Sequence, residues 1–158
     1  MSSQDKLWVI SAVVGVHLGA LAISKLLSKP KKVEYLVTDA VAKPGGHYSP
    51  ATTWGDQLFV SGILPFQQNG DEFHGSLEDQ VKLALDNLTA VCKAGGTDVK
   101  NLIMTRVYVT DVEHWPRFNA VYKQYFGDIK PARAVVPVPH LHHGFLIEIE
   151  AVCAIIPK

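Results

Sequence analysis

The sequence has little cysteine and no net charge. Its two cysteines, Cys92 and Cys153, stand far apart, each among apolar residues. This pattern is typical of buried free thiols in a reducing compartment and excludes a disulfide framework. Fifteen basic and fifteen acidic side chains give a formal net charge of +0, and no basic stripe is interleaved with aromatic residues. The chain therefore lacks the general attraction to phosphate that supports nucleic-acid binding, and we expect no nucleic-acid partner.

Formal charge is also missing from most of the first 28 residues. Residues 7–24 contain no Asp, Glu, Lys or Arg, and a helix of about 20 residues at about 1.5 Å each spans roughly 30 Å, the thickness of a hydrocarbon core. The sequence therefore predicts an N-terminal hydrophobic helix in residues 1–28 that enters a membrane through residues 7–27. Lysines follow it at positions 25, 29, 31 and 32, whereas only Lys6 precedes it. The positive-inside rule then predicts a single-pass anchor, with the following domain facing the cytoplasm.

Three other interpretations of this segment stay open. The small residues Ala20 and Ala22 fit the cleavage site of a secretory signal, although the lysines lie on the wrong side of the apolar run. A buried core helix would need more protein to cover it than the rest of the chain supplies. A mitochondrial transit peptide normally carries arginines, and this segment has none. We interpret residues 29–36 as a basic linker followed by the first strand.

Beyond this segment the hydrophobic spacing alternates between strand and helix periods, as expected for one globular domain. Strands are predicted over residues 33–38, 56–65 and 102–110, with an extended segment near residue 51 and two closing strands inside residues 129–156. A first helix is predicted from the N-cap Ser76 to Gly95 and Gly96, and a second over residues 113–126, ended by Gly127. This order predicts an α+β fold with two helices on one face of a mixed sheet.

Arg133 stands among β-branched residues in the first closing strand. A guanidinium taken out of water needs an oppositely charged partner. The residues leave two choices open, a structural ion pair with Glu148 or Glu150, or the carboxylate of a ligand. Glu148 and Glu150 alternate with isoleucines, so both should lie on the same face of the last strand.

A histidine cluster, "HLHH" at residues 140–143, lies between the two closing strands, which we expect to form a hairpin. Metal sites need ligands that converge inward and usually a second layer of hydrogen-bond partners. Connecting loops of this kind are normally solvated, so we predict no metal site.

Five segments in this order and spacing resemble the reactive intermediate deaminases of the RidA/YjgF family. They are "GGHYSPA" (45–51), "FVSGILP" (59–65), "QVKLALDNLTAVCKAGG" (80–96), "VYVTDVEHWPRFNAVYKQYF" (107–126) and "KPARAVVPV" with "IEIEAVC" (130–153). The resemblance begins near Thr38 and implies a RidA-like domain over residues 37–158. It implies a chorismate-mutase-like fold, a homotrimer whose sheets close a barrel, and an active site in each cleft between subunits. The implied reaction needs no cofactor and hydrolyses enamines and imines, such as 2-aminoacrylate, to 2-oxo acids and ammonia.

Matched position by position, the resemblance assigns roles to five residues. Arg133 would bind the substrate carboxylate, which suits a planar fork that offers two parallel N–H groups. Glu148 would hold the hydrolytic water or assist proton transfer, a task for a carboxylate whose pKa the surroundings adjust. Tyr48 would close the substrate pocket, beside Ser61 and Gly62.

Three further positions bear on specificity. Asn119 also matches a family position, and we interpret it as structural, since a helix asparagine often satisfies a neighbouring backbone group. His47 stands where many members have proline, and Val135 where some have cysteine, so covalent thiol chemistry is not expected. Two other functions stay open. One is a non-catalytic trimer that binds small carboxylates or acts like a chaperone, and the other, less favoured by charge, is an endoribonuclease.

Overall fold

The computed structural model describes residues 32–156. The predicted membrane helix of residues 1–28 lies outside the described residues, so the anchor and its orientation stay predictions. Between residues 32 and 156, no helix combines the length and the apolar character needed to cross a bilayer.

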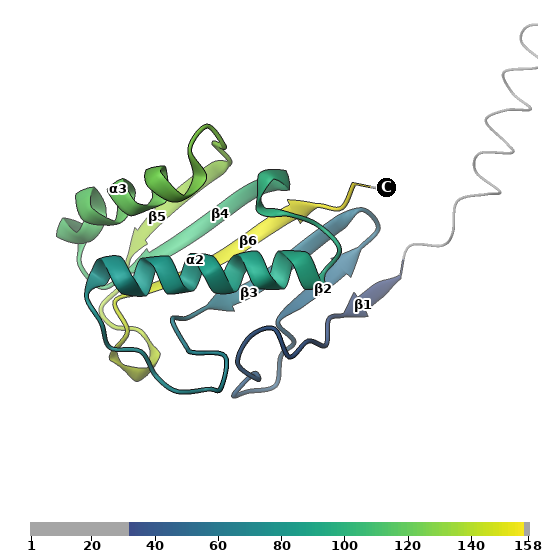
Figure 1. Ribbon diagram of the computed structural model, residues 1–158, viewed down its shortest axis with the longest axis horizontal. Helices are drawn as coiled ribbons and strands as arrows, with labels where there is room; N and C mark the ends of the chain where they lie inside the picture. Colours follow the sequence, from purple (N-terminus) through teal and green to yellow (C-terminus); the bar gives the residue numbers. More distant parts are fainter. Residues whose placement is uncertain (1–31, 157–158) are drawn as a thin grey trace, which may run out of the picture. The chain divides into compact units, whose positions relative to one another are not determined.

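Six strands form one sheet, and two α-helices cover one of its faces (Figure 1). The strands are β1 (Val33–Tyr35), β2 (Ala51–Trp54), β3 (Gln57–Ile63), β4 (Leu102–Val109), β5 (Ala132–Pro137) and β6 (Ile147–Ala154), and the helices are α2 (Leu77–Ala94) and α3 (Trp115–Phe126). The order across the sheet is β1-β2-β3-β6-β4-β5, and only β4 and β5 pair in parallel. The predicted mixed sheet with its two helices is confirmed.

The helix ends follow the predicted capping residues. Ser76 Oγ accepts a hydrogen bond from the backbone N–H of Asp79 at 3.2 Å, which satisfies one of the free donors in the first turn of α2. Gly96, just beyond the last turn of α2, has a φ of 80°. Gly127 ends α3 with a φ of 57°, a left-handed conformation that favours glycine.

The core lies between the helices and the sheet, and the alternation along β4 and β6 decides which side chains enter it. The side chains that point from these strands toward the helices are fully buried, namely Val107, Val109, Ile147 and Ile149. Cys92 of α2 and Cys153 of β6 meet in this core as free thiols with their Sγ atoms 3.3 Å apart. The prediction of two buried thiols is confirmed.

The opposite face of the sheet carries no helix in the described part of the chain. Arg106 of β4 and Glu150 of β6 lie on this face and form an ion pair, with 2.6 Å between Nη1 and Oε1. Phe59, Val152 and Met104 form an apolar row beside it, because Phe59 pairs with Val152 and Val152 with Met104. Phe59 is 39% exposed. Sheet faces with apolar rows are normally covered by another layer, so this open face is a candidate surface for self-association.

The predicted hairpin between the closing strands is wrong. β4 lies between β5 and β6, pairing in parallel with the first and antiparallel with the second. A parallel pair requires a crossover connection, and α3 supplies it between β4 and β5. The histidine cluster therefore lies in the connection from β5 to β6, which passes the end of β4.

Candidate functional site

The end of β3 is tied to the glycine-rich segment that precedes β2. Ser61 Oγ donates a hydrogen bond to the carbonyl of Ser49 at 2.7 Å, and the backbone N–H of Ser61 donates to the carbonyl of Pro50 at 3.1 Å. The pairing of β3 with β6 shifts register between Val60 and Ile63. A bulge of this kind redirects side chains at the end of a strand, and here it falls on the predicted pair Ser61 and Gly62.

Glu148 of β6 packs directly against Gly62. A Cβ placed on Gly62 would overlap Glu148 Oε1, so only glycine allows the carboxylate to lie over the backbone of β3. Burial raises the pKa of Glu148, the nearby His142 opposes this effect, and the charge of Glu150 adds to it. Within residues 32–156 no hydrogen bond contributes to this pKa. The carboxyl group is thus half-buried and free to bind a water molecule or a substrate proton.

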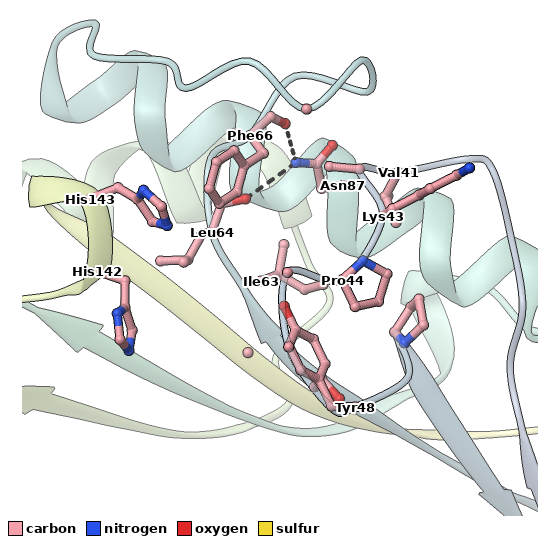
Figure 2. A pocket seen from close by; sticks show the side chains of 17 residues that line it. Val41, Lys43, Pro44, Tyr48, Ile63, Leu64, Phe66, Asn87, His142 and His143 are labelled. Carbon is pink, nitrogen blue, oxygen red and sulfur yellow. Dashed lines mark hydrogen bonds between the residues drawn. The ribbon is translucent and has the colours of Figure 1, made fainter.

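One hollow contains this carboxylate, and a second hollow adjoins it. One, of about 520 Å³, is lined by Glu148 and Tyr108 together with Gly62 and His142. The other, of about 480 Å³, also includes Gly62 and His142 in its wall, along with Ser61 and Tyr48 (Figure 2). The four residues that sequence analysis assigned to this part of the pocket therefore line two hollows that share Gly62 and His142, and Tyr48 is 55% exposed. Tyr108 and His142 were missed, because neither belongs to a local pattern that predicts proximity to Glu148.

Arg133 of β5 lies against α3. Its Nη2 donates a hydrogen bond to Asn119 Oδ1 at 2.9 Å, and its guanidinium carbon lies 5.3 Å from the ring centroid of Phe118 and 4.6 Å from that of Tyr122. Cation–π contacts of this kind hold a guanidinium in one plane. Among the described residues no carboxylate pairs with Arg133, since Glu150 pairs with Arg106. The structural ion pair that sequence analysis left open is not formed.

Asn119 has a different partner from the one we expected. Its side-chain oxygen accepts a hydrogen bond from Arg133, not from a neighbouring backbone group. The expected partner, a neighbouring backbone group, is therefore replaced by the Arg133 guanidinium, and the structural role of Asn119 stays a prediction. The two residues come from different elements, α3 and β5, so no local sequence signal reveals the contact.

Arg133 and Glu148 lie on opposite faces of the sheet within one chain. Arg133 contacts α3 on the face that the helices cover, whereas Glu148 alternates with the buried Ile147 and Ile149 and so points to the open face. Within one protomer the two side chains are therefore directed to different sides of the sheet.

One residue of the histidine cluster, His143, is held by a carboxylate that sequence analysis overlooked. Glu72 Oε1 lies 2.7 Å from His143 Nδ1, and Glu72 Oε2 lies 2.8 Å from His74 Nε2. Both hydrogen bonds lower the pKa of Glu72, and the one with His74 has the larger effect. His143 adopts a φ of 60°, which is uncommon for a residue other than glycine. Across residues 32–156 no group of three His, Cys, Asp or Glu side chains is arranged to hold a metal ion.

The two departures from the family pattern lie outside the lining of both hollows. His47 is exposed beside Tyr48, and Val135 is half-buried on β5, two residues after Arg133. Neither contributes a hydrogen bond to the groups described above. Their effect on specificity stays a prediction.

Comparisons with known proteins agree on one family. The model of the family described as Endoribonuclease L-PSP matches residues 38–155. A RutC family protein of Pyrococcus horikoshii is 38% identical over 120 residues, which cover 75% of this chain and 95% of the relative. The human 2-iminobutanoate/2-iminopropanoate deaminase is 35% identical over 119 residues, covering 73% of this chain and 87% of the relative.

Solved structures show the same fold. The crystal structure of Escherichia coli TdcF with bound serine matches with a TM-score of 0.73 and 30% identity, over 77% of this chain and 98% of that one. RidA from the Antarctic bacterium Psychrobacter matches with a TM-score of 0.73 and 28% identity, over the same shares of the two chains. The α+β sheet with two helices described above is therefore the architecture of these proteins.

Proposed function

This chain belongs to the RidA/YjgF family, also called L-PSP or RutC, and from that premise we propose that it hydrolyses reactive enamine and imine acids to 2-oxo acids and ammonia. The family predicted from the five sequence segments is confirmed. The family includes proteins named as imine deaminases, and TdcF binds serine. Both facts support a small amino or imino acid as the ligand.

The observation that supports the proposal most is the difference between the surroundings of Arg133 and those of Glu148. Arg133 is held in place by Asn119 and two aromatic rings, with no carboxylate partner in the described part of the chain. Its fork is therefore available to a substrate carboxylate, which it can bind through two parallel hydrogen bonds. Glu148 is half-buried, and burial raises the pKa of its carboxyl group. A carboxyl group whose pKa is raised in this way is suited to exchange protons with a bound water molecule.

The proposed reaction needs only water and a proton carrier. A proton adds to C3 of the enamine, which gives the iminium ion of the same acid. Glu148 then takes a proton from water while the water oxygen bonds to C2 and the C=N π electrons move to nitrogen, which gives the neutral carbinolamine. Glu148 returns this proton to the nitrogen, ammonia leaves with the C–N electron pair, and the hydroxyl proton passes to Glu148 and then to ammonia or solvent as the C2–O bond becomes the carbonyl of the 2-oxo acid.

We propose that the site is completed by a homotrimer. Arg133 and Glu148 face away from each other in one protomer, so Arg133 of the partner subunit must approach the hollow beside Glu148. The open sheet face with its row of Phe59, Val152 and Met104 supports such an association. In a trimer with closed cyclic symmetry, the three clefts between neighbouring subunits would be equivalent.

An assay of the full chain tests the proposal. 2-Aminoacrylate is generated from serine by a pyridoxal-phosphate dehydratase, and the release of ammonia and 2-oxo acid is followed with and without the protein. We expect ammonia and 2-oxo acid to be released faster with the protein than without it. A rate equal to the uncatalysed one would leave a non-catalytic carboxylate-binding protein as the better explanation, and cleavage of RNA with steep salt dependence would favour an endoribonuclease.

A further inference from the structure

The hollow beside Tyr48 is larger and more apolar than a three-carbon substrate requires. Its volume of about 480 Å³ lies in the range of about 300–1,000 Å³ that is typical of small-molecule pockets. Most of its wall is apolar, formed by Val41, Pro44, Pro50, Ile63, Leu64 and Phe66. 2-Aminoacrylate carries only one carbon beyond C2, so it would leave most of this space unused.

Several polar side chains of the wall are engaged within the chain or point away from the hollow. Asn87 uses its Nδ2 to donate hydrogen bonds to the carbonyls of Leu64, at 3.3 Å, and Phe66, at 2.8 Å. Both bonds are visible in Figure 2, where Asn87 braces the segment after β3 and the ammonium of Lys43 points away from the hollow. His143 is engaged by Glu72. The interior of the hollow is therefore suited to an uncharged, apolar group.

The hollow opens onto the place where the reaction would occur. It shares Gly62 and His142 with the neighbouring hollow that contains Glu148. A 2-imino acid with its C2 beside Glu148 and its carboxylate on Arg133 of the partner subunit could extend its side chain past Gly62. The apolar wall formed by Ile63 and Leu64, which follow Gly62 directly, would then contact that side chain.

We propose that this hollow is a specificity subsite that receives the side chain of a 2-imino acid, and that the chain prefers imines with branched or aromatic apolar side chains over 2-iminopropanoate and 2-aminoacrylate. This inference rests on the proposed function and names its substrate class. The physical basis is the removal of substrate carbon atoms from water, which favours each additional buried methylene group.

A comparison of two imines tests the preference. A flavin-dependent amino acid oxidase generates the imine of leucine or of alanine, and the full chain is assayed for 2-oxo acid release from each. We expect kcat/KM for the leucine imine to exceed that for the alanine imine by at least about tenfold, within the discrimination that apolar pockets achieve. A ratio of one or less would overturn the inference. Hydrolysis of neither imine would contradict the proposed function itself.

Two variants locate the preference in the hollow. Leu64→Trp fills it from the segment after β3, and Ala42→Phe fills it from the segment before β2. Each should lower kcat/KM for the leucine imine by at least about tenfold and that for the alanine imine by less than about threefold. Ile156→Trp is the matched control, because Ile156 is 59% exposed near the far end of β6. Equal losses for both imines in both folded variants would overturn the inference.

A binding measurement decides the same question without turnover. The affinity of the unmodified chain for 4-methyl-2-oxopentanoate and for pyruvate, the two products, is measured by calorimetry. We expect tighter binding of the larger 2-oxo acid, and loss of that difference in Leu64→Trp and Ala42→Phe. Equal affinities in the unmodified chain would contradict the subsite even if neither imine were hydrolysed.

Discussion

Glu148→Gln will lower kcat for imine hydrolysis by about 10²–10⁴-fold, the usual contribution of a positioned general acid–base group. Glutamine keeps the shape of the side chain and its contact with Gly62, but it cannot take a proton from water. In the proposed mechanism Arg133 binds the carboxylate, so the affinity for the 2-oxo acid product should change little. Steady-state kinetics and calorimetry on the same preparation separate the two effects.

The matched control is Glu78→Gln. Glu78 belongs to the first turn of α2, away from both hollows, and pairs with Arg117 on an exposed surface. Exposed ion pairs contribute little, so this variant should keep kcat within about threefold of the unmodified chain. Equal losses in the two variants would exclude a special role for Glu148.

The pH dependence offers a second measurement on Glu148. Burial raises the pKa of this carboxyl group above its ordinary value, and only the ionised form can act as a base. We therefore expect kcat/KM to fall as the pH drops through a pKa higher than that of an ordinary glutamate. The acidic limb of the pH profile should disappear in Glu148→Gln, and a limb that persists there would assign it to another group.

Arg133→Lys and Arg133→Ala will both weaken substrate binding strongly. Each of two hydrogen bonds to a charged group contributes about 1.5–3 kcal/mol, so losing both should raise KM by about 10²-fold or more. Lysine keeps the charge but loses the planar fork and its packing between Phe118, Tyr122 and Asn119. Arg133→Lys should therefore bind substrate only slightly more tightly than Arg133→Ala.

Arg117→Ala is the control for this series. Arg117 belongs to α3, the helix against which Arg133 packs, and it donates two hydrogen bonds of 2.7 Å to Glu78 on an exposed surface. We expect KM to stay within about threefold of the unmodified value. If Arg133→Lys bound substrate as well as the unmodified chain, the bidentate role of Arg133 would be excluded.

Local features of the fold were predictable because their causes are local. The spacing of Leu77, Val81, Leu85 and Leu88 predicts the buried face of α2, and all four are buried. Ser76 and Gly96 mark the ends of that helix through hydrogen bonds and backbone freedom that neighbouring residues determine. The common face of Glu148 and Glu150 follows from strand alternation in the same way.

The features that sequence analysis missed depend on contacts between distant segments. The parallel pairing of β4 with β5 replaces the expected hairpin, and nothing within the closing strands themselves specifies it. Asn119 reaches Arg133 only because α3 packs against β5. Glu72 joins His74 to His143 across two connecting segments, and no periodic pattern predicts contacts between segments of that kind.

Co-expression of Arg133→Ala chains with Glu148→Gln chains tests most directly whether each site draws on two protomers. Each variant alone should be nearly inactive. In trimers assembled at random from equal amounts, a cleft has an even chance of an intact Glu148 and an even chance of an intact Arg133, so about 25% of unmodified activity should return. A mixture as inactive as its two parents would contradict a site shared between subunits.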